Sequence, residues 1–279
     1  MPALPRLPAN GAAIPVIGFG TFRLQGEPCR RAVATALASG YRHIDTAAMY
    51  DNEADVGQAL AGSGIARSEI FVTTKVWSSD IGAGALQRSA ARSLAKLGLA
   101  QVDLLLIHWP NPAIPLAQSI GALCDARRRG LAAHIGVSNF PVAMLEAAVT
   151  LAASDGETIA ALQCEHHPHL DQSKLIAAAA RHGIGFISYC PLGRGSLVND
   201  ATIAGIARKR DRTPAQIILR WHLQKGVAAI PRSARPEHIA ENIAIADFAL
   251  DAADMAAISA LHRPDGRMVS PPSAPKWDD

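Results

Sequence analysis

Four side chains in this sequence could together protonate a developing alkoxide: Asp45, Tyr50, Lys75 and His108. A tyrosine with a pKa near 10 exchanges protons poorly at neutral pH unless a neighbouring cation stabilises its phenolate, and Lys75 could supply that charge. Asp45 would hold Lys75 charged and oriented, and His108 would donate a hydrogen bond to the oxygen that becomes negative. Such a set suits hydride delivery to a carbonyl carbon, with Tyr50 as the general acid and no metal required.

Period-two alternation in three strand-like segments places three of these residues at one edge of a sheet. Side chains two residues apart share a face of a strand, so Asp45 shares a face with His43, while Lys75 and His108 end similar alternating sets. In a barrel of parallel strands the active site lies at the carboxyl ends of the strands, where these residues fall. Tyr50 follows in the loop after the first of the three segments and overhangs them.

Eight short β-branched segments alternate with longer Ala-rich stretches whose apolar residues recur at helical spacing. The segments span residues 16–21, 41–47, 70–77, 102–109, 133–140, 159–167, 183–190 and 226–233. Repeats of about 30 residues are typical of strand–helix–strand units with parallel strands. We therefore expect an α/β fold, a (β/α)8 TIM barrel. An open doubly wound sheet is the alternative, but "GFGTFR" places Arg23 where its dinucleotide fingerprint needs a third glycine.

The two ends of the chain predict additions to the barrel. Asn10-Gly11 within "LPRLPANGAAIPVIG" indicates a β-hairpin turn, so an N-terminal β-hairpin should precede the barrel. The proline-rich ending "RPDGRMVSPPSAPKWDD" predicts an irregular C-terminal tail, whose Trp277 either covers the mouth of the barrel or is disordered. No linker or low-complexity tract divides the chain, so residues 1–279 are expected to form a single domain.

Composition narrows the class of partner. Lys and Arg number 27 against 24 Asp and Glu, without a basic run interleaved with aromatic residues, which argues against nucleic acid. No segment approaches the roughly 20 apolar residues of a membrane span, and no signal peptide is recognisable. The four cysteines form no C-x-x-C pair, as is typical of a reducing compartment. We expect a cytoplasmic protein with a small-molecule partner and no obligate protein partner, by default a monomer.

Several ordered motifs resemble those of the aldo-keto reductase superfamily over almost the whole chain. They are "GFGTF", "YRHIDTAAMYDNE", "TTKVW", "LLIHWP", "GVSNF", "SYCPLGRG" and "AIPRS". The short connections and the ending "DGRMVSPPSAPKW" look most like bacterial 2,5-diketo-D-gluconic acid reductases and related methylglyoxal-reducing enzymes. The resemblance implies a (β/α)8 oxidoreductase that uses NADPH to reduce a small carbonyl substrate such as an aldehyde, an α-dicarbonyl or a keto-sugar acid. Its catalytic Asp, Tyr, Lys and His match the four residues chosen above on chemical grounds.

The same resemblance assigns binding residues. Ser138, Asn139 and Gln163 would bind the nicotinamide carboxamide, and Tyr189 would stack on the ring. The remaining cofactor contacts would come from Gly20, Thr21, Phe22 and Asp45, from the loop with Leu192, Gly193 and Gly195, and from Arg232, Ser233, Arg235, His238, Glu241 and Asn242. Glycines in that loop would let backbone N–H groups approach the pyrophosphate. The substrate would contact Phe22, Tyr50, Trp77, His108 and Trp109.

One cofactor position departs from the family pattern, because His238 stands where NADPH-dependent relatives usually carry arginine. Arginine offers a phosphate a permanently charged fork, whereas histidine is mostly neutral at pH 7 and offers one donor. Losing a charge-assisted bond worth about 1.5–3 kcal/mol would lower the NADPH preference by roughly tenfold to a hundredfold. Arg235 could restore part of it. We therefore predict that NADPH is accepted and that NADH is also used.

Two other readings of the sequence remain open. A metal-dependent barrel hydrolase could use His43, Asp45 and the later histidines, but it would need H-x-H in place of "HID" and leaves Tyr50 without a role. In "EHHPHL", Pro168 interrupts any regular register, so His166, His167 and His169 are expected to be structural or rim residues rather than zinc ligands. The other possibility is a non-catalytic sensor that binds the nicotinamide cofactor without turnover.

Overall fold

The computed structural model describes residues 4–278, and its centre is one parallel sheet of eight strands. In chain order these are β3 (Phe19–Gly20), β4 (His43–Asp45), β5 (Phe71–Val76), β6 (Val102–Ile107), β7 (Ala132–Ser138), β8 (Ile159–Glu165), β9 (Gly185–Tyr189) and β10 (Ala228–Ala229). Neighbours in the sheet are also neighbours in sequence, from β3 to β10. Seven of the strands lie within the expected segments, and β7 begins one residue before its segment, at Ala132. The expected parallel α/β arrangement is confirmed.

The sheet curls until its two edges meet. Ile17, just before β3, forms a parallel bridge with Ala229 of β10. The Gly18 N–H donates to the Ala229 carbonyl at 2.9 Å, and the Gly20 N–H donates to the Pro231 carbonyl at 3.0 Å. These bonds bring the carboxyl ends of all eight strands toward one mouth.

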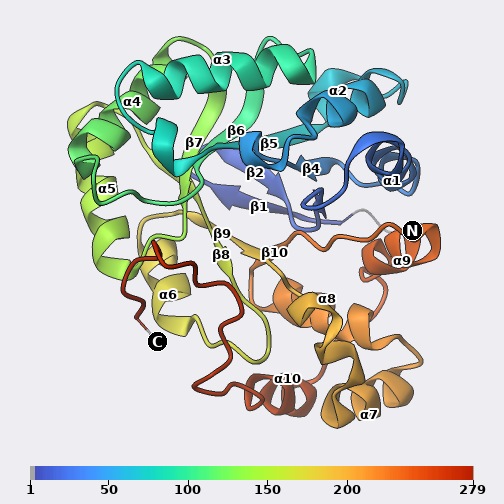
Figure 1. Ribbon diagram of the computed structural model, residues 1–279. Coiled ribbons are helices and arrows are strands. Elements are labelled where there is room, and N and C mark those ends of the chain that lie inside the picture. The colour runs from blue at the N-terminus through green and yellow to red at the C-terminus, as the bar shows by residue number, and fades with distance from the viewer. Residues whose placement is uncertain (1–3, 279) are drawn as a thin grey trace.

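Helices surround the curled sheet, as Figure 1 shows. They are α1 (Gly26–Ala38), α2 (Glu53–Ala61), α3 (Ala85–Leu97), α4 (Leu116–Arg128), α5 (Val142–Ser154), α6 (Ser173–Arg181), α7 (Ala201–Arg210), α8 (Pro214–Gln224), α9 (Pro236–Ile243) and α10 (Ala252–Ser259). The sequence pattern predicted one helix per strand, whereas two helices, α7 and α8, join β9 to β10, and α10 follows α9. Apolar side chains of α7, α8 and α10, among them Trp221, form a cluster of their own away from the sheet.

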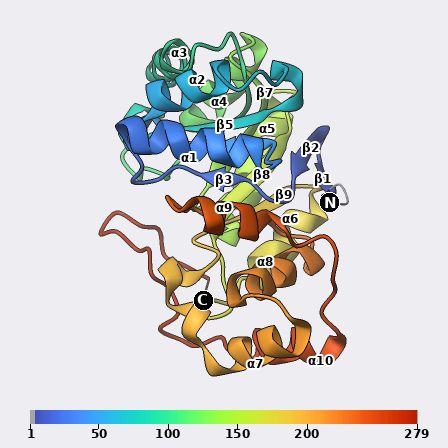
Figure 2. The same ribbon diagram turned by 90° about the vertical axis from the view of Figure 1, so that its right-hand side faces the viewer.

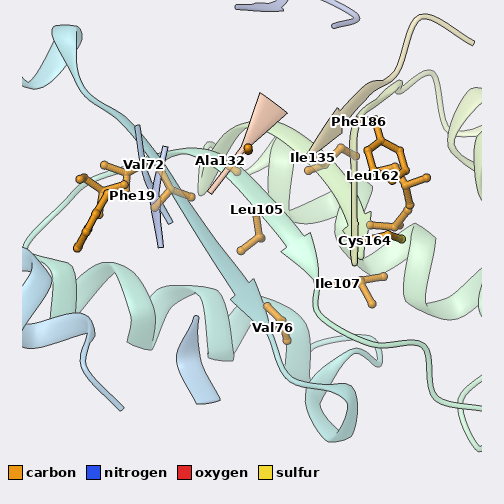
Figure 3. Close-up of a cluster of buried hydrophobic side chains, with 14 of the residues drawn as sticks. Phe19, Val72, Val76, Leu105, Ile107, Ala132, Ile135, Leu162, Cys164 and Phe186 are labelled. Carbon is orange, nitrogen blue, oxygen red and sulfur yellow. The ribbon is translucent and has the colours of Figure 1, made fainter. Parts of the chain in front are cut away.

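The core has two layers because each strand alternates its side chains between the two faces of the sheet. Val72, Leu105 and Leu162 belong to the layer between strands and helices, which Figure 3 shows in part. Phe71 and Leu106 belong to a smaller cluster inside the ring of strands. The alternation predicted from sequence is therefore correct in β5 and β6, and it fixes which residues face the interior.

The N-terminal hairpin predicted at Asn10-Gly11 is present. Strands β1 (Arg6–Ala9) and β2 (Ala12–Pro15) pair antiparallel, and the two turn residues have φ angles of 42° and 87°. These left-handed values are those of a turn that suits Asn-Gly. The Asn10 side-chain amide donates to the Ile159 carbonyl at 2.8 Å and to the His182 carbonyl at 2.9 Å. Because Ile159 begins β8, the hairpin covers the amino ends of the strands, opposite the mouth; Figure 2 shows it at one end of the sheet.

Residues 262–278 contain neither helix nor strand and run past α6 toward the C-terminus (Figure 1). The buried Glu165 carboxylate at the end of β8 holds this segment, because it accepts the Met268 N–H at 2.8 Å and the Val269 N–H at 2.9 Å. Gly266 passes so close to His169 that a Cβ there would lie 1.8 Å from the His169 carbonyl oxygen. Within residues 4–278, no helix combines the length and apolar character that a membrane crossing requires. All four cysteines are free thiols.

Candidate active site

Three of the four residues singled out for chemistry meet through the amine of Lys75. Its Nζ lies 2.5 Å from Asp45 Oδ1, 2.9 Å from the Thr46 carbonyl oxygen and 3.5 Å from the Tyr50 hydroxyl. The side chains of Lys75 and Asp45 are 0% and 2% exposed. In a buried position a charge must be paired, and this ammonium has a carboxylate and a carbonyl as partners. It is therefore held as a cation beside the phenol.

Burial controls how these groups hold their protons. It raises the pKa of Tyr50 well above its usual value, and the negative charge of Asp45 raises it further. The phenol therefore carries its proton at neutral pH, as a proton donor must. Burial lowers the pKa of Lys75, while its contact with Asp45 opposes that change. Lys75 does not lower the resting pKa of Tyr50 below its usual value, contrary to the expectation from sequence; its charge matters when the phenolate forms.

His108 completes the group on the mouth side. Its ring centroid lies 5.5 Å from the Tyr50 ring and 5.2 Å from the Trp77 ring, both edge-on. Burial lowers the pKa of His108 well below its usual value, and the nearby Lys75 charge acts in the same direction. The imidazole is therefore neutral at pH 7 and can donate one N–H to a substrate oxygen.

A short turn presents Tyr50 to this cluster. The 3₁₀ turn Ala48–Tyr50 follows β4 directly and ends on Asp51, whose φ is 52°. Asn52 then fixes the turn: its amide donates to the Thr21 carbonyl at 2.9 Å and accepts from the Thr46 hydroxyl at 2.7 Å. Asn52 was missed in the sequence analysis, although a buried asparagine in a turn next to the candidate tyrosine is typical of side-chain bonding to the backbone.

Aromatic side chains lie around Tyr50 and His108. Phe22 is 41% exposed, and its ring lies 5.0 Å from the Tyr50 ring. Trp109 is buried beside His108, and Trp277 of the C-terminal segment packs edge-on against it at 6.0 Å. The structure shows this contact of Trp277 with Trp109, and whether the tail covers the mouth stays a prediction. Ring contacts thus connect four of the predicted substrate residues, Phe22, Tyr50, Trp77 and His108, and Trp277 packs against the fifth, Trp109.

The amide and hydroxyl side chains assigned to the nicotinamide lie at the ends of β7, β8 and β9. Asn139 is fully engaged by the protein: its Oδ1 accepts from the Tyr189 hydroxyl at 2.7 Å, and its Nδ2 donates to the His108 carbonyl at 2.9 Å. Nδ2 also lies 3.0 Å from the Ser138 hydroxyl. In this structure Asn139 therefore orients the residues around it, while Tyr189 is half-buried at the end of β9.

Gln163 makes a contact that the sequence analysis did not anticipate. Its side-chain Nε2 donates to Asp45 Oδ2 at 2.8 Å, so the carboxylate is held on one oxygen by Lys75 and on the other by Gln163. No local signal could have shown this bond, because 118 residues separate the two partners in sequence.

The residues assigned to the phosphate end of the cofactor lie on the rim. Arg232, Arg235 and His238 are exposed, and a Cβ on Gly195 would meet no other atom within 4 Å, so there is free space at this glycine. Arg235 pairs with Glu237 at 2.9 Å. Asn242 is buried, unlike these neighbours. Cationic side chains and free space at a loop glycine on one rim suit an extended dinucleotide with several phosphates.

The other histidines have structural surroundings. His43 is buried inside the ring of strands with Nε2 3.0 Å from the Thr73 hydroxyl, and burial lowers its pKa to about 4. His167 contacts the Glu165 carboxylate at 3.0 Å, and His166 stacks on Trp221. In the part of the chain that the structure describes, no three His, Cys, Asp or Glu side chains are grouped to hold a metal ion.

Comparisons with known proteins agree with this geometry. Residues 16–263 match the sequence model of the aldo/keto reductase family. Methylglyoxal reductase DkgB of Salmonella typhimurium is 44% identical over 268 residues, which cover 95% of this chain and 99% of that protein.

Two solved structures are also similar. One, of a protein provisionally assigned as a 2,5-diketo-D-gluconic acid reductase B, superposes with a TM-score of 0.96 at 42% identity and covers 99% of this chain and 98% of its own. A Bombyx mori aldo-keto reductase in complex with NADP has a TM-score of 0.89 at 33% identity and covers 98% of this chain and 97% of its own. The chain belongs to the aldo/keto reductase family.

Proposed function

We propose that this protein is an NADPH-dependent oxidoreductase that reduces small aldehydes, α-dicarbonyls or keto-sugar acids to alcohols, with NADH as a second usable cofactor. The observation that supports this most is the buried ammonium of Lys75, 2.5 Å from the Asp45 carboxylate and 3.5 Å from the Tyr50 hydroxyl. The methylglyoxal reductase among its relatives supports an α-dicarbonyl substrate, since methylglyoxal is one.

The residues of this chain divide the work between them. A substrate carbonyl enters between the aromatic side chains of the mouth and accepts hydrogen bonds from the Tyr50 hydroxyl and the neutral His108 ring. When bound, the nicotinamide cofactor supplies the hydride. As charge grows on the substrate oxygen, Tyr50 donates its proton, and the adjacent Lys75 cation stabilises the phenolate that remains. Asp45 keeps that cation in place, and the buried site keeps water away from it.

Replacement of Tyr50 by phenylalanine tests this assignment. Tyr50→Phe removes the general acid but keeps the ring against Phe22, so kcat with methylglyoxal should fall roughly 10²–10⁴-fold. The measurement is the loss of reduced-nicotinamide absorbance, repeated with a simple aromatic aldehyde. NADPH should still bind to the variant, which fluorescence titration checks.

Two outcomes would count against the proposal. Unchanged turnover by Tyr50→Phe would show that Tyr50 is not the general acid. NADPH binding by the wild-type chain without turnover of any carbonyl compound in a broad aldehyde panel would favour the non-catalytic sensor instead.

We also infer a complete (β/α)8 barrel built as one domain from residues 1–279, ending in a tail that borders the mouth. The hydrogen bonds between the two edge strands support closure, and the continuous sheet from β3 to β10 supports a single domain. The tail is supported by the contacts of Glu165 and Trp277. Four free thiols are consistent with our proposal of a cytoplasmic location.

A further inference from the structure

Gln163 reaches across the mouth to the catalytic aspartate. It lies on β8, which is separated from β4 of Asp45 by three intervening strands in the sheet. The bond from Gln163 Nε2 to Asp45 Oδ2 therefore exists only because the sheet curls and brings distant strand ends together. Both residues are 1% exposed, so bulk water cannot replace the donor if it is lost.

The Asp45 carboxylate also decides which way the Gln163 amide is turned. An ionised carboxylate only accepts hydrogen bonds, so the NH₂ group of Gln163 must face it and the Oε1 oxygen is left as an acceptor for another donor. The opposite orientation would set two oxygens against each other. In the part of the chain that the structure describes, no donor contacts Gln163 Oε1.

We propose that Gln163 is a positioning residue that couples recognition of the cofactor to the placement of the Asp45–Lys75 pair. The proposal rests on the proposed function and on the assignment, from the family resemblance, of this amide to the nicotinamide carboxamide. Through Nε2 the amide holds one oxygen of Asp45, and through Oε1 it offers an acceptor to an N–H group. A change at Asp45 should therefore alter cofactor affinity through Gln163, and a change at Gln163 should alter proton transfer through Asp45.

Equilibrium binding of NADP⁺ tests the coupling without any turnover. In Asp45→Asn, the new amide lets Gln163 turn and present NH₂ where Oε1 was, so the dissociation constant should rise about tenfold, the value of one hydrogen bond. Gln163→Met, of similar size but without donor or acceptor, should weaken binding by about the same factor. Both changes disrupt the same Gln163–Asp45 interaction. The dissociation constant of the double variant should therefore rise by much less than the hundredfold expected from two independent effects. Tryptophan fluorescence quenching measures all four dissociation constants, with circular dichroism to confirm folding.

Ser138→Ala is the matched control for this cycle. It removes another assigned carboxamide contact, and none of the bonds that hold Asp45 involves Ser138. In the double variant Ser138→Ala/Asp45→Asn, the fold-change in the dissociation constant should therefore equal the product of the two single fold-changes. If Gln163→Met/Asp45→Asn also shows the full product, the proposal is overturned.

The pH profile of Gln163→Glu distinguishes positioning from simple packing. A glutamic acid that is still protonated can donate to Asp45, whereas the ionised form repels it, since two adjacent carboxylates share one proton. At saturating cofactor, kcat of Gln163→Glu should approach that of the wild type near pH 6 and fall steeply toward pH 8. The kcat of Gln163→Met should be low across this pH range.

Parallel profiles for Gln163→Glu and Gln163→Met would overturn the proposal. Failure of the proposed function looks different: NADP⁺ binding without carbonyl turnover would end the proposed reaction, while the binding cycle would still decide the coupling. A wild-type chain that binds no NADP⁺ would end both.

Discussion

The protonation states of single residues explain how this site could act as an acid near neutral pH. Burial keeps Tyr50 protonated and His108 neutral, so both can donate a hydrogen bond to the same carbonyl oxygen. Lys75 keeps its charge because Asp45 and the Thr46 carbonyl compensate for its burial. Removing one member of a buried carboxylate–ammonium pair is costly, because the remaining charge then has no partner.

We expect the preference between NADPH and NADH to be set at single residues as well. Replacing His238 by arginine restores a permanent charged fork at the rim, so the ratio of kcat/KM for NADPH to that for NADH should rise roughly tenfold to a hundredfold. We expect Arg235 to compensate only in part for His238, because it is already paired with Glu237. Steady-state kinetics with each cofactor measure the ratio.

The exposed His262→Arg, which adds a similar charge in the C-terminal part of the chain, is the matched control for this prediction and should leave the ratio unchanged. A wild-type preference for NADPH above about 10³ would show that His238 has no such effect.

Among the elements, the C-terminal segment depends on one side chain more than on its own sequence. Glu165 accepts two successive backbone N–H groups from it, and Arg267 stacks over the Trp277 ring at 3.8 Å. A segment without helix or strand bonds is ordered here by contacts at a few points. The position of Trp277 therefore depends on several anchors, among them the Glu165 carboxylate and the Val142 N–H, which donates to the Asp278 carboxylate at 2.8 Å.

Glu165→Gln should loosen this segment. The neutral amide keeps one acceptor oxygen but loses the charge and the second acceptor, so the Met268 and Val269 amides should exchange with deuterium several-fold faster. Helices α3 and α4 should exchange as in the wild type. Asp171→Asn, at an exposed carboxylate nearby, is the control. Equal exchange rates at residues 268 and 269 in both variants would show that Glu165 does not hold the segment.

For the whole molecule, buried histidines link stability to pH. Burial lowers the pKa of His43 and His222 to about 4 and that of His166 well below its usual value. The unfolded chain binds protons at these positions below a pKa of about 6.5, and the folded chain does not. The free energy of unfolding should therefore be intact above that pH and fall as the pH drops toward about 4.

Denaturant unfolding at several pH values measures this loss, which reaches up to about 1.4 kcal/mol per pH unit for each such histidine. His166→Phe keeps a flat ring against Trp221, and neither ring nitrogen of His166 has a hydrogen-bond partner, so this variant should have a shallower slope between pH 6.5 and 4. His262→Phe, at an exposed site, should keep the wild-type slope. A steeper slope in His166→Phe would contradict the account.

Much of the fold could be predicted from the sequence. Alternation in residues 70–77 and 102–109 identified the inward-facing Lys75 and His108, because side-chain direction in a strand has a fixed period of two. The turn at Asn10-Gly11 likewise followed from local backbone preference. The predicted ends of the strands were less accurate. Strands β3 and β10 have two residues each and lie within longer predicted segments, because the length of a strand depends on the partner strand it pairs with.

The sequence by itself determined the parallel α/β fold, the faces of its strands and the four chemical groups at or just beyond the strand ends, because these depend on residue type and local period. Only the tertiary structure decided that Gln163 holds Asp45, that Glu165 holds the C-terminal segment and that Trp277 meets Trp109. Those contacts join residues far apart in the chain and arise from the curl of the sheet. Local patterns carry no information about such distances, so the fold had to be complete before they could be seen.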